Sequence, residues 1–247
     1  MTLNGKNQKE ADSTYAWNQR RGFSKAPFMG ALFHQFFPNE CPRCKRETQP
    51  QFILCGRCVI ELMGVGPSLD RQEGPGRIDR LWHYGPYHSI LGDLIRKLKY
   101  QSMLSLERVL AWCLVQVYQQ LGTRGIFVVP VPPHPAAVRM RGFSHTFLLV
   151  KAAKRLGLPH MQILPLLRHR TVPYRPQASL KDLKERKTHV MSSFEAARGK
   201  SFPEHIVLFD DVYTSGATLE AAAVALQNHV QTIDAVVLAC TAAHQQQ

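Results

Sequence analysis

The chain has 247 residues, a formal net charge of +13 at pH 7 and a hydrophobic content of 45%. That length suits one medium-sized domain plus a small module, and the hydrophobic content is ordinary for a globular protein. No apolar run approaches the length of a transmembrane helix and the N-terminus has no signal-peptide core, so we expect a cytoplasmic protein rather than a membrane-spanning or secreted one.

The positive charge is concentrated in one segment. Residues 139–187 contain twelve Lys or Arg and only two acidic residues, so this segment carries +10 of the formal +13. Scattered basic residues would simply form a solvated surface. Such a one-sided block instead favours a polyanionic partner or substrate.

Residues 1–37 are expected to be an N-terminal extension outside the folded modules. The first thirty or so are polar and without periodicity, which is typical of a loose segment. Residues 28–37 are apolar and aromatic, and we expect them to pack against a neighbouring domain, with a membrane-surface helix as the alternative.

Residues 38–63 are predicted to form a four-cysteine zinc module. Cys41 and Cys44 form one C-x-x-C pair, and Cys55 and Cys58 form a second pair ten residues later. Two such pairs can place four thiolates tetrahedrally around one Zn²⁺, and four thiolates leave no open position for catalysis, so the metal would be structural. Two disulfides are the main alternative, which a cytoplasmic location disfavours; a redox C-x-x-C would need only one pair.

Residues 64–80 are rich in Gly and Pro and are predicted to be a linker to a main domain over residues 81–247. That domain is expected to begin with a strand over 81–87. Two helices should follow, over 91–100 and 105–121, because apolar residues recur there at helical spacing. Cys113 and Cys240 lie in apolar segments and are expected in the core.

The segment 126–132 predicts a second buried strand, and the prolines at 130, 132, 133 and 135 predict a rigid loop after it. Arg139 and Arg141 follow that loop. Ser144 is a suitable N-cap for a helix reaching Leu156.

The segment 168–187 is basic and contains prolines, which is typical of a surface loop. Lys181, Lys184 and Lys187 are spaced at about one helical turn and could share a face. They are the first candidates for contacts with a nucleic-acid backbone. A second group of candidates lies in the cysteine module: Arg43, Lys45, Arg46 and Arg57.

The segment 206–218 predicts a ligand site. Its first four residues are apolar and suit a strand buried on both faces. Asp210 and Asp211 follow, then a loop of small and hydroxylated residues, then an alanine-rich helix and a last strand over 235–239. A strand, a Gly-containing loop and a helix start together favour an anion, because free backbone N–H groups and the helix dipole point at the ligand. The two carboxylates need hydroxyl or cationic partners.

All thirteen positions of 206–218 fit one pattern, which resembles the phosphoribosyl pyrophosphate (PRPP) signature of the type I phosphoribosyltransferases. Other motifs are similar to the ComF/GntX family, and the likeness covers about residues 38 to 243. They are Val129-Pro130-Val131-Pro132, Arg141-Gly142-Phe143, Pro176-Gln177, Leu180, Arg186 and Phe194. Ser144 and His145 stand where that family usually has Asn and Gln.

The resemblance implies an α/β fold: a mostly parallel sheet flanked by helices, preceded by a small zinc-ribbon-like module. It implies a ribose site at Asp210 and Asp211 and a 5′-phosphate site in the loop after them. Arg139 and Arg141 would neutralise pyrophosphate, assisted by Mg²⁺. The phosphate loop comprises Thr214, Ser215, Gly216, Ala217 and Thr218. The basic segment 168–187 corresponds to a loop that closes over the substrate in phosphoribosyltransferases.

Two functions follow from the resemblance. The first is a ComF-like protein of natural competence that handles incoming single-stranded DNA in the cytoplasm, keeps a PRPP-binding domain and works with the competence machinery. The alternative is an active, Mg²⁺-dependent phosphoribosyltransferase with an unidentified acceptor. A purely structural scaffold would leave the pattern after residue 209 unexplained.

Overall fold

The computed structural model describes residues 16–19, 39–68, 72–73, 76–122, 126–170 and 193–241. A six-stranded sheet forms its centre, with the strand order β1-β2-β8-β7-β3-β4. All neighbouring strands are parallel except β1, which pairs antiparallel with β2. The strands are β1 (Gln72–Glu73), β2 (Arg80–Pro86), β3 (Phe127–Pro130), β4 (Gln162–Ile163), β7 (His205–Tyr213) and β8 (Thr232–Cys240).

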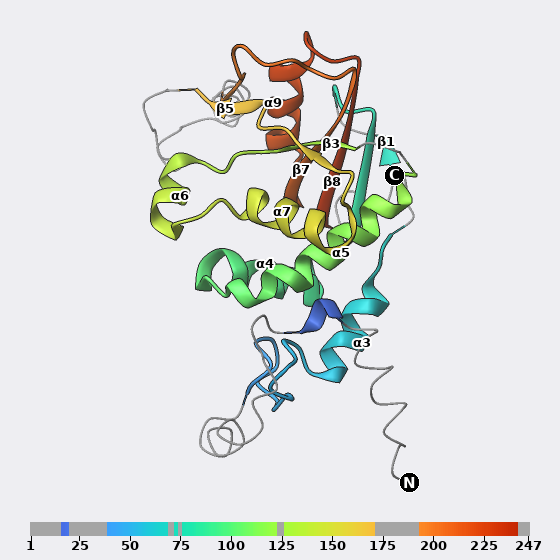
Figure 1. The fold of residues 1–247 in the computed structure, drawn as a ribbon, viewed down its shortest axis with the longest axis vertical. Helices are drawn as coiled ribbons and strands as arrows, with labels where there is room; N and C mark the ends of the chain where they lie inside the picture. Colours follow the sequence, from blue (N-terminus) through green and yellow to red (C-terminus); the bar gives the residue numbers. More distant parts are fainter. Residues whose placement is uncertain are drawn as a thin grey trace.

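Helices cover both faces of this sheet, which confirms the predicted α/β architecture. Figure 1 shows α4, α5 and α7 between the sheet and the cysteine-containing segment, with α9 on the sheet's other side. A short antiparallel pair, β5 (Leu167–His169) and β6 (Phe194–Ala196), packs near α9. The α-helices are α3 (Gly56–Val65), α4 (Ile90–Gln101), α5 (Glu107–Gln120), α6 (Pro135–Arg141), α7 (His145–Gly157) and α9 (Ala217–Leu226).

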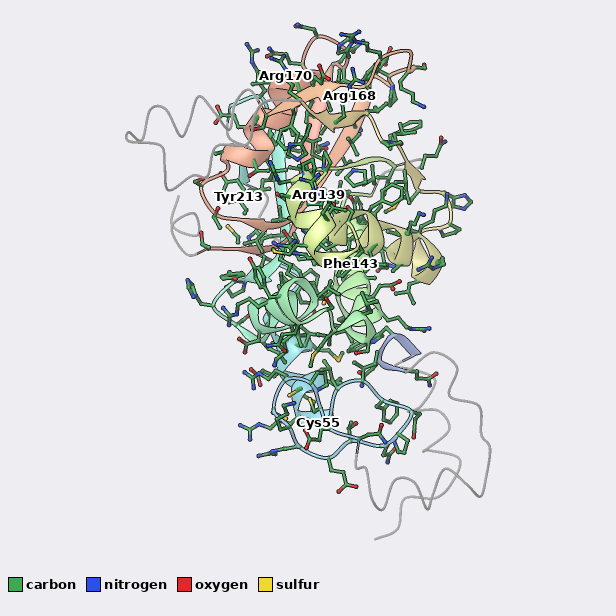
Figure 2. The ribbon with its side chains drawn as sticks, turned by 90° about the vertical axis from the view of Figure 1, so that its left-hand side faces the viewer. Cys55, Arg139, Phe143, Arg168, Arg170 and Tyr213 are labelled. Carbon is green, nitrogen blue, oxygen red and sulfur yellow. The ribbon has the colours of Figure 1, made fainter. Side chains whose placement is uncertain are left out.

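The two ends of the molecule carry different chemistry. Figure 2 places Cys55 toward one end of the long axis and Arg168 with Arg170 at the other, with Arg139 between them. Cys55 and the pair Arg168 and Arg170 are therefore separated by the body of the α/β domain.

The predicted helices around the core are confirmed with small changes in their ends. Ser89 caps α4, its side chain accepting a hydrogen bond from the N–H of Leu91 at 3.2 Å. Ser144 caps α7 as predicted, accepting from the N–H of Phe147 at 3.4 Å. These caps satisfy helix N–H groups that have no partner within the helix.

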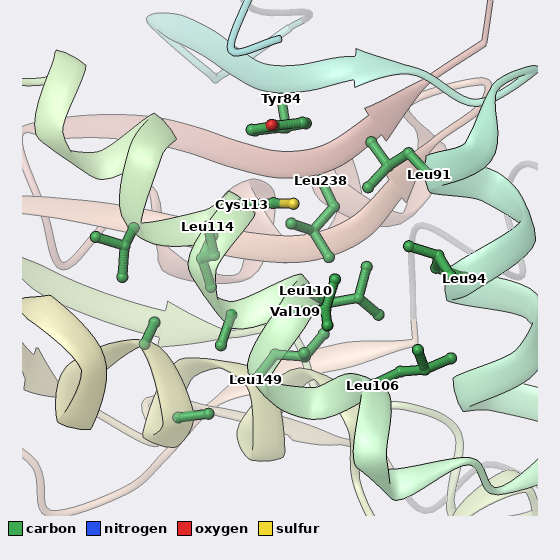
Figure 3. Packing of buried hydrophobic residues seen from close by; sticks show 14 of the residues in the cluster. Tyr84, Leu91, Leu94, Leu106, Val109, Leu110, Cys113, Leu114, Leu149 and Leu238 are labelled. Atoms are coloured by element: carbon green, nitrogen blue, oxygen red, sulfur yellow. The ribbon is translucent and has the colours of Figure 1, made fainter. Parts of the chain in front are cut away.

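The larger core cluster lies between the sheet and α4, α5 and α7 (Figure 3). Cys113 of α5 is buried in it, as the sequence predicted. Cys240 is also buried, in the second cluster, which lies on the α9 side of the sheet. Strands with apolar residues on both faces are the expected result of parallel pairing under two helix layers.

The cysteine module is not a separate folded unit, because its buried residues belong to the larger core cluster. The Tyr84 hydroxyl of β2 donates to the carbonyl of Leu62 in α3 at 3.1 Å. Gly66 passes so close to β2 that a Cβ there would lie 1.8 Å from the carbonyl oxygen of Tyr84. A side chain at residue 66 would thus separate the module from the sheet.

Residues 16–19 of the N-terminal extension pack onto α5 and onto this module, so this short part of the extension is not loose. The ring of Trp17 stacks on Trp112 of α5 with centroids 4.4 Å apart. Asn18 is buried, and its side chain both accepts from the N–H of Leu54 and donates to its carbonyl. The apolar stretch 28–37 lies outside the described residues.

Two further expectations need correction. The predicted linker contains β1 and the buried Ile78, so part of it belongs to the main domain. The rigid loop expected after β3 is instead interrupted by α6, which begins at Pro135 because proline is well tolerated in the first turn of a helix. None of the helices in the described ranges is long and apolar enough to cross a membrane.

We predict that Leu110→Ala lowers the free energy of unfolding by about 2–5 kcal/mol, because it opens a cavity under a fully buried side chain. Leu104→Ala is the matched control, since that leucine is 50% exposed and leaves no cavity. Urea unfolding of both variants measures the difference. Equal losses in the two variants would contradict the packing described here.

Candidate functional site

The two predicted carboxylates lie within β7 rather than after it, because the strand continues to Tyr213. Side chains alternate across a strand, so Asp210 and Asp211 leave its two faces. Asp211 is only 3% exposed, on the α4 and α7 side, whereas Asp210 is half-buried. The Asp210 Oδ1 accepts a hydrogen bond from the N–H of Asp211 at 2.8 Å.

Two basic side chains converge on Asp211. Lys99, in the last turn of α4, places Nζ 2.6 Å from Asp211 Oδ2. His145, the first residue of α7, places Nε2 3.3 Å from the same oxygen. Both partners come from helices on one side of the sheet, so the packing of α4 and α7 against β7 determines this contact.

The electrostatics separate the two carboxylates. Burial by itself raises the pKa of Asp211, but the attraction of Lys99 and the contact with His145 outweigh it and hold that pKa below its usual range. Burial and the neighbouring charge of Asp211 raise the pKa of Asp210 to about 8. At neutral pH Asp211 is therefore ionised, and Asp210 holds a proton that a ligand could displace.

Arg141 extends this network toward solvent. Its Nη1 lies 3.3 Å from His145 Nδ1. A guanidinium can only donate, so Nδ1 accepts and the ring proton lies on Nε2, facing Asp211. The Nε of Arg141 is buried, and none of the described residues accepts a hydrogen bond from it. Arg141 thus has donor capacity available for an anion.

The loop after β7 has the features of an anion site. Gly216 adopts a φ of +77°, a conformation that favours glycine, and it is the N-cap of α9 without any side-chain cap. Thr214, Ser215 and Thr218 are exposed. The buried Tyr213 supports this turn from below, since a Cβ at Gly216 would lie 2.6 Å from its hydroxyl oxygen. Exposed hydroxyls therefore lie beside a helix N-terminus that no side chain caps.

Figure 2 labels Tyr213, the last residue of β7, and Arg139 of α6, both in the middle part of the molecule. Arg139 is exposed and Arg141 is half-buried, both in the last turn of α6. The structure joins Arg141 to Asp211 through His145. Lys181, Lys184, Lys187 and most of the predicted closing loop lie outside the described residues.

Lys99 and His145 are the site residues that sequence reasoning missed. Lys99 looked like an ordinary basic residue near a helix end, where the helix dipole favours one anyway. His145 was visible only as a departure from the family pattern. Ligand atoms of His145, Asp210 and Asp211 lie within 4.8 Å of one another. Lys99 already supplies positive charge there, so this group does not require a metal ion.

The four predicted cysteines form a second site. Four sulfur atoms all lie within 4.8 Å of one another, those of Cys41, Cys44, Cys55 and Cys58. Four thiolates so arranged fit the donor set of a structural zinc. The first pair lies in a turn and the second at the start of α3, where Cys55 is the N-cap. All six cysteines lie in the described ranges and all are free, so the disulfide alternative has no support.

These buried thiols need a bound cation if they are to be ionised. Burial raises the pKa of Cys58 and of Cys55, whereas a hydrogen bond from the backbone of Arg46 lowers the pKa of Cys44 to about 7. Buried thiols become thiolates when a metal ion compensates their charge. Arg43 links this module to the main domain, because its guanidinium pairs with Glu61 at 2.8 Å and Asp93 at 3.4 Å.

Metal analysis of protein purified without added zinc should give one zinc per chain. Cys58→Ser should lose that metal and unfold the module, because the binding energy of a structural zinc is largely folding energy. Cys240→Ser is the control, since it changes a buried cysteine remote from the cluster. A protein without zinc, or a control that loses it equally, would contradict this site.

Asp210→Asn should stabilise the ligand-free protein increasingly as the pH rises from about 4 to about 8. The carboxyl releases its proton near pH 3.8 when unfolded and near pH 8 when folded, so the unfolded state gains stability across that window. One unit of pKa shift corresponds to about 1.4 kcal/mol, so we expect a gain above about 1 kcal/mol at pH 9.

Urea unfolding at pH 5, 7 and 9 measures this gain. Glu204→Gln is the control because residue 204 is exposed. A change in stability that is the same at every pH would show that Asp210 is not held protonated by its surroundings.

No protein-family model matches this chain, and no curated protein sequence matches it. The likeness to the ComF/GntX family therefore depends on the motifs quoted from the sequence. The function must be argued from the two sites and from their chemistry.

Proposed function

We propose that the chain has a type I phosphoribosyltransferase fold and binds PRPP with Mg²⁺ at the end of β7. The observation that carries this proposal is the convergence of three kinds of group at one place. A carboxylate pair, an uncapped loop of exposed hydroxyls and Arg141 with its available donors lie around the same strand end. A phosphorylated sugar carrying a diphosphate is complementary to all three.

Each part of PRPP has a partner in this arrangement. The ribose hydroxyls bind Asp210 and Asp211, and the 5′-phosphate binds the N–H groups and hydroxyls of Thr214 to Thr218. The pyrophosphate binds Arg141 and Arg139, with Mg²⁺ taking oxygen ligands from the diphosphate, the ribose and water. No direct protein ligand to Mg²⁺ is needed, because Lys99 already compensates the buried charge of Asp211.

The two carboxylates take different roles in this proposal. Asp211 is anchored by Lys99 and His145, so it fixes the position of the ribose site. Asp210 accepts hydrogen bonds from the ribose hydroxyls, which stabilises its ionised form and lowers its pKa on binding. Binding should then release a proton at neutral pH.

The cysteine module would hold a structural zinc and stabilise α4, the helix that forms one side of the ligand site. Its contacts through Arg43 reach the first turn of α4, the helix that carries Lys99 at its other end. The metal would therefore support the PRPP site without taking part in any chemistry, because four thiolates leave no open coordination position.

We further propose a ComF-like role, in which the protein handles single-stranded DNA during natural competence. The supporting observation is charge. Residues 94–106 and 135–157 flank the site and contain no acidic residue, and together they carry eight Lys or Arg. Arg96, Lys99 and Arg155 pair with Asp93, Asp211 and Glu107, and a PRPP molecule would use only some of the other five cations. The alternative is an active transferase that displaces pyrophosphate at C1 of the ribose.

Calorimetry with PRPP and Mg²⁺ tests the ligand. Thr214→Val and Arg141→Met should each weaken binding about tenfold to a hundredfold, since each removes a charge-assisted hydrogen bond. Arg155→Met is the control because it removes the same charge from the far end of α7, where Arg155 pairs with Glu107. Unchanged affinity in both site variants would place the ligand elsewhere.

Pyrophosphate release, followed with and without single-stranded DNA, separates the two functions. PRPP binding without turnover favours the binding protein. Release that requires an added acceptor favours the transferase. Proton release on PRPP binding, measured in buffers of different ionisation enthalpy, tests the role assigned to Asp210 in either case.

A further inference from the structure

Tyr100 is an exposed aromatic residue beside the candidate site that the proposed PRPP contacts do not use. It is 69% exposed and follows Lys99 in the last turn of α4. Met140, which precedes Arg141 in α6, is 82% exposed. Isolated exposed apolar side chains are common, so exposure alone decides nothing. The contact of Tyr100 with Arg141 is more informative.

The ring of Tyr100 is held in place on one face. The guanidinium carbon of Arg141 lies 5.3 Å from the ring centroid, which is a cation–π contact. Arg141 is itself positioned by His145 at 3.3 Å. The ring is therefore fixed relative to β7, and most of its surface still faces solvent.

Basic side chains outnumber acidic ones in the chain segments that flank the ring. Between residues 94 and 106 the charged residues are Arg96, which pairs with Asp93, Lys97, and Lys99, which pairs with Asp211. The charged residues of α6 are Arg139 and Arg141. A protein partner would need a strongly acidic surface here, and a duplex would present no base faces. A single strand offers phosphates to the cations and unpaired bases to the aromatic ring.

We propose that Tyr100, braced by Arg141, is a stacking platform for a base of single-stranded DNA. The neighbouring Arg139 and Lys97 would contact the phosphates on either side of that base. This inference rests on the proposed handling of single-stranded DNA and names the surface that does it. Because Arg141 also faces the pyrophosphate position, the DNA and PRPP sites share this side chain.

The platform differs from the contacts expected of Lys181, Lys184 and Lys187. Those lysines would act through charge, so reversing them should reduce the salt dependence of binding, by about 0.7 in log–log slope for each phosphate that is no longer neutralised. Stacking on Tyr100 releases no counterions. Its removal should therefore lower affinity while leaving the salt slope unchanged.

The test is fluorescence anisotropy with a labelled oligothymidylate of about 16 nucleotides, titrated at several salt concentrations. Tyr100→Ala should weaken binding about 5- to 150-fold with the wild-type salt slope. Tyr100→Phe should bind as the wild type does, because the ring is retained. Ile60→Ala is the matched control, since Ile60 is 72% exposed on α3. Zinc content and urea unfolding verify that each variant is folded.

Three results would overturn the platform: wild-type affinity in Tyr100→Ala, an equal loss in Tyr100→Phe, or a loss accompanied by a reduced salt slope. A second readout is photocrosslinking of an oligonucleotide containing 5-bromouracil, which should map to Tyr100. Wild-type protein that binds no single strand at low salt would instead remove the DNA function itself. The PRPP calorimetry is independent of that outcome.

Discussion

A carboxylate in a protein interior stays ionised only if cations or hydrogen-bond donors compensate its charge, and Lys99 does this for Asp211. The rest of the site depends on that ion pair. It fixes the end of α4 against β7, and His145 joins the same oxygen from α7. Removing Lys99 would leave a buried charge without its main partner. The buried charge of Asp211 therefore holds α4, α7 and β7 together at one strand end, although they are distant in sequence.

The ion pair also explains why two adjacent aspartates can differ chemically. The negative charge of Asp211 adds to the burial of Asp210 and raises the pKa of Asp210 to about 8. A protonated carboxyl costs less to bury than a carboxylate, yet it can lose its proton when hydroxyl donors arrive. The protonated form of Asp210 favours the stability of the fold, whereas ligand binding favours its ionised form. Functional sites often retain groups that a stable fold alone would not keep.

The same helix connects the cysteine module to the candidate ligand site. Arg43 of the cysteine module pairs with Asp93 in the first turn of α4, and Lys99 and Tyr100 lie in its last turn. The module shares a hydrophobic core with the sheet, so it cannot reorient independently. A metal bound by the four cysteines would thus stabilise the wall of the ligand site from a distance. Lys97 and Lys99 belong to the same helix as Tyr100, whereas Arg139 and Arg141 come from α6.

Local patterns in the chain were enough to predict the main strands and helices of the core and the cysteine cluster. Apolar runs, helix caps and the paired C-x-x-C spacing act over short distances, so β7, α4, α7 and the four converging sulfurs could be predicted from them. The partners of Asp211, in contrast, emerged only from tertiary packing. Lys99 lies 112 positions before Asp211 in the chain. Neither helical spacing nor charge patterning predicts which strand a lysine side chain will contact. The packing of α4 and α7 on the sheet decides that, because a long-range contact depends on how whole elements are placed.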